Sequence, residues 1–165
     1  MAITILRFVN IILAALLAGT SFGIWMGFNP AHFSPSIYAA LQQNTIRVFN
    51  VLMISLVIIA TIITIASAFL QRNDKHVFIG LLVAAVFFIA CILISRFGNK
   101  PIQDVMLKWN PDLLPANWTV LRDKWWSYHI MRTITELISL SIITWVGIRK
   151  ENITIADKSI TTSMD

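Results

Sequence analysis

Polar and aromatic residues recur at helical spacing near the end of the chain. Intervals of three, four and seven separate most of them, which places them on one face of a helix with Arg132 at its edge. They are Arg122, Trp125, Trp126, His129, Thr133 and Glu136. Histidine transfers protons, arginine stabilises negative charge and indoles stack on planar rings. The pattern favours a site for a planar or polar ligand, although Arg132 and Glu136, four residues apart, can also simply neutralise each other.

A second group repeats this spacing earlier in the chain, at Gln43, Arg47 and Asn50. Trp25, Arg96 and Asn99 join both groups if the helices run antiparallel, because the relevant helix ends then meet at one membrane surface. Burying several polar groups at one depth costs free energy that packing alone does not require, which favours function. Single tryptophans and basic residues also anchor helices at interfaces, and we assign Lys108 and Trp109 to that role.

The composition is that of a membrane protein. Of the 165 residues, 57% are hydrophobic and 13% charged, whereas soluble domains have about 45 to 50% and about 25%. The single cysteine, Cys91, excludes a disulfide scaffold within the chain. The net charge of +5 is spread without a basic stripe, so we expect membrane lipids and no nucleic acid as partners.

Four apolar runs predict four transmembrane helices. They cover residues 8–28, 48–70, 77–95 and about 118–148, and the second helix is expected to begin near Pro35. The predicted fold is an all-α membrane protein, an antiparallel four-transmembrane-helix bundle. Its connections are 29–36, 71–76 and a long structured loop, 97–117, between helices three and four.

Residues 1–150 are predicted to form the transmembrane domain, and 151–165 a polar, disordered tail. We expect a multi-pass protein of the cell membrane with cytoplasmic termini. Gly19, Gly23 and Gly27 recur every four residues and favour close helix packing inside the bundle, with dimerisation as the alternative. The oligomeric state is left open.

A longer stretch resembles the signature of the anthrone oxygenase family, small four-helix membrane proteins. The resemblance is carried by Gly98-Asn99-Lys100-Pro101-Ile102-Gln103-Asp104, Trp118, Leu121-Arg122-Asp123, Trp125-Trp126, His129 and Arg132-Thr133, and it extends to Gly19, Phe22-Gly23, Gln43, Arg47 and Asn50. It implies oxidation of an anthrone, or a similar hydrophobic aromatic small molecule, by O2.

Roles follow from that implied chemistry. His129 is the candidate general base, with Arg122 and Arg47 stabilising the oxyanion. Substrate-binding candidates are Trp25, Gln43, Asn50, Asn99, Trp125, Trp126 and Arg132, and Asp104 is expected to orient an arginine. We expect no cofactor and no metal. The alternatives are haem or a metal held by His129 and His32, or a module that binds a quinone or lipid without chemistry.

Overall fold

The computed structural model describes the backbone of residues 1–162 and the side chains of residues 1–149. Its helices are α1 (Ala2–Gly27), η1 (Pro30–His32), α2 (Pro35–Leu70), α3 (Lys75–Ile94), η2 (Ser95–Asn99), α4 (Lys100–Met106) and α5 (Trp118–Thr162). Within this part of the chain, four helical segments are long and apolar enough to cross a membrane. The chain is therefore a multi-pass membrane protein.

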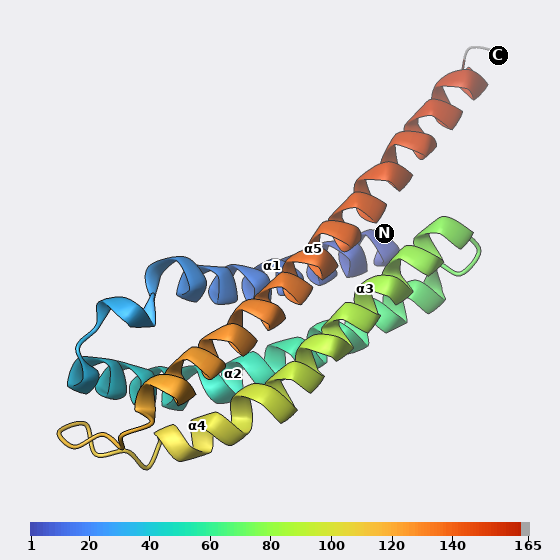
Figure 1. Ribbon diagram of the computed structural model, residues 1–165. Helices are drawn as coiled ribbons and strands as arrows, with labels where there is room; N and C mark the ends of the chain where they lie inside the picture. The colour runs from blue at the N-terminus through green and yellow to red at the C-terminus, as the bar shows by residue number, and fades with distance from the viewer. Residues whose placement is uncertain (163–165) are drawn as a thin grey trace.

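The four long helices form a closed ring. Helix α1 packs against α2, α2 against α3, α3 against α5, and α5 against α1 (Figure 1). Short connections make successive helices antiparallel, and this confirms the predicted four-helix bundle. The C-terminal turns of α5 extend beyond the other helices (Figure 1).

The third helix is longer than the sequence predicts. Helix α3 passes through the π-helical turn η2 directly into α4, so the segment from 95 to 106 is helical and the loop covers only 107–117. The prediction of a loop over 97–117 was wrong for its first ten residues. Pro101 lies in the first turn of α4, where a missing backbone N–H costs least, and the π turn before it shifts the hydrogen-bond register.

The last helix also differs from expectation. Helix α5 continues to Thr162, through most of the segment 151–165 that the sequence predicts to be disordered. Residues 163–165 lie outside the described residues. The division of the chain at residue 150 stays a prediction.

Polar side chains join α1 to α2 at the end of the bundle that carries the N-terminus and the α2–α3 turn. The hydroxyl of Thr64 donates to Oδ1 of Asn10 over 2.8 Å, and Nε of Arg7 donates to Oε1 of Gln71 over 2.7 Å. The amide of Gln71 in turn donates to the hydroxyl of Ser67. Hydrogen bonds between helices hold a bundle together where lipid provides little hydrophobic driving force.

The regularly spaced glycines of α1 do not pack inside the bundle. Gly19, Gly23 and Gly27 are exposed, and a Cβ added at any of them would meet nothing within 4 Å. The predicted packing role was therefore wrong. Helix α1 instead buries its opposite face, which includes Leu17 and Ser21.

Two glycines allow a close approach to α5, Gly80 from α3 and Gly98 from the η2 turn. A Cβ on Gly80 would lie 2.7 Å from Cγ2 of Val146, and one on Gly98 would lie 2.7 Å from the ring of Tyr128. Both glycines let the helix backbones come together where a side chain would separate them.

Two apolar clusters fill the bundle. One extends along its middle and includes Leu17, Val57 and Phe88. The other lies at the end of the 107–117 loop and includes Tyr38 and Met106. The polar residues of interest lie where the two clusters meet.

Candidate functional site

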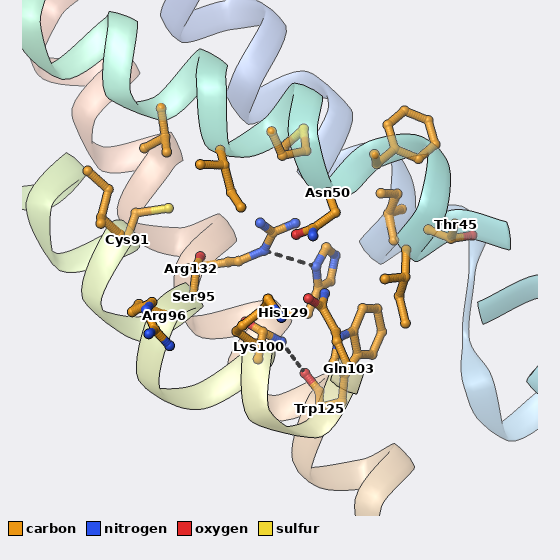
Figure 2. Close-up of a pocket in the computed structure, with 18 of the residues that line it drawn as sticks. Thr45, Asn50, Cys91, Ser95, Arg96, Lys100, Gln103, Trp125, His129 and Arg132 are labelled. Carbon is orange, nitrogen blue, oxygen red and sulfur yellow. Dashed lines mark hydrogen bonds between the residues drawn. The ribbon is translucent and has the colours of Figure 1, made fainter. Parts of the chain in front are cut away.

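A cavity of about 550 Å³ opens between α2, the η2 turn, α4 and α5, within the size range of small-molecule sites. Its α2 wall is largely apolar, whereas the facing wall is largely polar (Figure 2). The α2 wall comprises Thr45, Ile46, Phe49, Asn50, Met53, Ile54, Val57 and Ile58. The other residues that line it are Ile24, Cys91, Ile92, Ser95, Arg96, Asn99, Lys100, Gln103, Asp104, Trp125, His129 and Arg132.

His129 lines this cavity from α5 and is fully buried in the protein. Its Nδ1 accepts a hydrogen bond from Nε of Arg132 over 3.3 Å, and its Nε2 lies 3.2 Å from the carbonyl oxygen of Ser21. Because Nδ1 is the acceptor, Nε2 carries the proton and donates to Ser21. The imidazole is therefore neutral, and its Nδ1 lone pair is occupied by the hydrogen bond from Arg132.

Two indoles hold the imidazole in place. The ring of Trp125 stacks on that of His129 with centroids 5.3 Å apart and planes 8° apart, and Trp126 stacks at 5.5 Å and 23°. Since the two indoles lie one turn before His129 on α5, the helix itself fixes the orientation of the imidazole.

Arg132 carries positive charge into the cavity. Figure 2 shows its side chain extending from α5 toward Asn50 on α2, with His129 beside it. Its guanidinium has no carboxylate within ion-pair distance among the described residues, where Lys100–Asp104 and Arg122–Asp123 are the ion pairs. An oxygen-bearing ligand would find several N–H donors here.

Glu136, one turn further along α5, is also fully buried. Its Oε1 accepts from the thiol of Cys91 over 3.1 Å, and the buried hydroxyl of Ser21 on α1 lies beside the same carboxyl group. Glu136 thus bonds to α3, not to Arg132 as the four-residue spacing had allowed.

Six of the residues that the sequence placed in the site line the cavity: Asn50, Arg96, Asn99, Trp125, His129 and Arg132. The amide of Asn99 also donates to the backbone oxygen of Trp125 over 3.1 Å, which ties η2 to α5. Trp126 lies behind His129, outside the cavity lining.

Four other predicted residues lie elsewhere, and two of them were the proposed oxyanion-binding arginines. Arg47 is exposed, and Arg122 pairs with Asp123 and lies 5.0 Å from the centre of the Trp118 ring. Neither arginine lines the cavity that holds His129 and Asn50, so the structure does not place them where the expected oxyanion-stabilising role requires.

The remaining two residues have structural contacts. The buried amide of Gln43 donates to the carbonyl oxygens of Met106 and Trp109, at 3.0 and 2.9 Å, and so supports the start of the loop after α4. Trp25 packs edge-on against Phe22.

Sequence reasoning missed a further group of cavity residues, among them Ser95, Lys100 and Gln103. Lys100 and Gln103 were missed because residues 97–117 were expected to form a loop. The spacing of positions 96, 100 and 103 is helical, and it could have predicted that these residues share one face of a helix. Asp104 pairs with Lys100 instead of orienting an arginine.

The residues of the suggested haem or metal site do not form a ligand set. His32 is exposed on η1 and does not line the cavity, while both ring nitrogens of His129 are hydrogen-bonded. Within the described residues no group of three or more His, Cys, Asp or Glu side chains is arranged to hold a metal ion. The expectation of a site without a cofactor stays a prediction.

Comparison with known proteins identifies one family. A family model described as "Anthrone oxygenase" matches residues 43–142, well over half of the chain. The match begins on α2 and ends on α5, so it includes most of the cavity lining. No curated protein and no solved structure matches the chain.

Proposed function

Because the chain belongs to the anthrone oxygenase family, we propose that it oxidises a planar aromatic ketone of the anthrone type with O2 inside the cavity. The observation that carries this proposal is the arrangement of His129 and Arg132 on one wall, opposite the apolar side chains of α2. A proton acceptor, His129, and a hydrogen-bond donor for an oxyanion, Arg132, thus lie beside a surface suited to aromatic rings.

Binding of the substrate would change the partner of Arg132. A ketone oxygen that approaches the guanidinium competes with Nδ1 of His129 for its N–H groups. The imidazole lone pair then becomes available to the substrate. Hydrogen bonds of catalytic groups often reach their working geometry only in the complex with substrate.

The chemistry begins with a proton transfer. A C–H bond of the substrate's methylene breaks, its proton moves to Nδ1 of His129, and the electron pair delocalises onto the ketone oxygen held by Arg132. Forming an imidazolium beside a guanidinium is unfavourable alone, but the negative charge that spreads over the substrate at the same time offsets their repulsion.

Oxygen then reacts with the carbanion. One electron passes to O2, and the resulting radical and superoxide combine to form a C–O bond. The proton on His129 passes to the peroxide and gives a hydroperoxide. The remaining C–H bond at that carbon and the O–O bond then break, which releases water and leaves a second ketone. One atom of O2 ends in the new carbonyl group and the other in water, so the substrate supplies all the electrons and no metal or flavin is required.

The test is anthrone oxidation by the purified protein reconstituted in lipid. Replacing His129 with alanine should lower the rate about a hundred- to ten-thousand-fold, the usual contribution of a general base. Conversion is followed by anthraquinone absorbance together with O2 consumption, with one O2 expected per product. His76→Ala is the matched control, since His76 is exposed at the opposite end of α3.

Two results would contradict the proposal. Unchanged turnover in His129→Ala would assign the proton acceptor elsewhere. Saturable binding of anthrone without turnover by the wild-type protein would favour the reading as a quinone- or lipid-binding module. Folded yield, measured by size-exclusion chromatography in detergent, separates loss of function from loss of structure.

A further inference from the structure

The polar wall of the cavity holds a second positive region beside the η2 turn. Arg96 comes from the π-helical turn and Lys100 from the start of α4, four residues later, and both line the cavity. Figure 2 labels both residues on this wall. Because Arg96 is exposed and Lys100 half-buried, this region lies at the mouth of the cavity, whereas His129 is fully enclosed.

The charges at the mouth are not balanced. Among the side chains of residues 1–149, Asp104 is the only carboxylate that lines the cavity, and it forms an ion pair with Lys100. Arg96 has no carboxylate within ion-pair distance among the residues with described side chains. The mouth therefore carries one uncompensated guanidinium that the proposed reaction does not use.

The wall of the mouth that α2 forms is apolar instead of charged. Ile54 and Ile58 of α2 line the cavity and remain 44% exposed, so the mouth is apolar on one side and cationic on the other. A ligand that packs against the apolar side and pairs with the cationic side has an apolar body and an acidic group. In such a partly desolvated site an ion pair gains more free energy than it does on an open surface.

We propose that the substrate is a planar aromatic ketone that carries a carboxylate, bound by Arg96 with the help of Lys100. This inference rests on the proposed function, because it assigns the reacting ketone to Arg132 and the acidic group to the mouth. Arg96 and Lys100 then determine which aromatic molecules are accepted, and they also orient the ring system with its methylene toward His129.

Equilibrium binding tests the inference without any oxidation step. Anthracene-2-carboxylate and its neutral analogue anthracene-2-carboxamide are titrated into the protein in phosphatidylcholine nanodiscs, with empty nanodiscs as the blank for partition into lipid. The wild type should bind the carboxylate at least about tenfold more tightly, equivalent to about 1.4 kcal/mol. Arg96→Gln should reduce this preference to below about threefold, a remaining difference of under about 0.7 kcal/mol.

Matched variants locate the effect. Arg72→Gln removes an exposed arginine from the α2–α3 connection, outside the cavity lining, and should leave the preference unchanged. Asp104→Asn removes the one carboxylate of the lining and should increase it. Equal affinity for the two probes in the wild type, or an unchanged preference in Arg96→Gln, would overturn the inference while leaving anthrone oxidation as an independent result.

An anionic lipid headgroup has the same charge as the proposed substituent. The titration is therefore repeated in nanodiscs that contain phosphatidylglycerol. We expect the carboxylate preference to persist. If phosphatidylglycerol abolishes it in the wild type but does not weaken carboxylate binding in Arg96→Gln, then Arg96 binds lipid, and the inference is wrong.

Discussion

A guanidinium stabilises an oxyanion only if its N–H groups reach the reacting oxygen. Arg132 meets this condition in the cavity, where it already donates to His129. Arg47 belongs to the adjacent face of α2 and is exposed. Only about 40° of rotation about the helix axis separates Arg47 from Gln43, at 3.6 residues per turn, yet this small angle moves its side chain out of the bundle.

Because Arg132 lines the cavity and Arg47 does not, substitutions of the two arginines should affect turnover differently. Arg132→Gln should lower the rate of anthrone oxidation about a hundredfold or more, as loss of an oxyanion donor does elsewhere, whereas Arg47→Gln should change it less than about twofold, as expected for an exposed residue. Initial rates of anthraquinone formation in the same lipid provide the comparison. Equal losses in the two variants would mean that the cavity is not the reaction site.

The π-helical turn η2 is the element that shapes the polar wall. It places Ser95, Arg96 and Asn99 along the cavity and continues the helix past Pro101. π-helical turns inside α-helices are rare and frequent at functional sites. The turn packs directly on α5 because Gly98 has no side chain to separate it from Tyr128.

Gly98→Ala should therefore weaken both the fold and the site. Its Cβ would lie 2.7 Å from the ring of Tyr128, and overpacking of this kind costs typically about 1 to 3 kcal/mol. We expect a lower unfolding midpoint in detergent together with reduced anthrone turnover. Gly23→Ala is the control, because a Cβ there meets open space; equal midpoints for the two variants would contradict the close approach.

The bundle as a whole separates its connections between two ends. The segments between α1 and α2 and between α4 and α5 lie at one end, whereas the turn between α2 and α3 lies at the other (Figure 1). If all four helices cross the bilayer, these ends face opposite compartments.

Cysteine labelling tests this topology. Ser34 and Asn73 are exposed in connections at opposite ends, and the native Cys91 is buried. Ser34→Cys and Asn73→Cys, made separately, should each react with a membrane-impermeant maleimide from only one side of sealed vesicles, and from opposite sides. Labelling of both positions from the same side would mean that α2 does not cross the membrane between them, which would contradict the four-helix topology.

The sequence by itself determined the parts of the structure that depend on local composition. Long uncharged runs predict membrane-spanning helices because hydrocarbon thickness sets their length. Helical spacing also grouped Trp125, His129 and Arg132 correctly, since residues on neighbouring turns of one helix stay together in any fold. The family resemblance was likewise a property of the sequence, and the family match confirms it.

Only the tertiary structure decided which face of each helix points inward. In a membrane protein the lipid is as apolar as the core, so hydrophobic periodicity does not distinguish the two faces. For this reason the glycines of α1 and the side chain of Arg47 lie outside the bundle although their spacing favoured the inside. The hydrogen bond from Cys91 to Glu136 likewise depends on how α3 packs against α5. The same packing decides that the π turn brings Arg96 and Lys100 to the cavity.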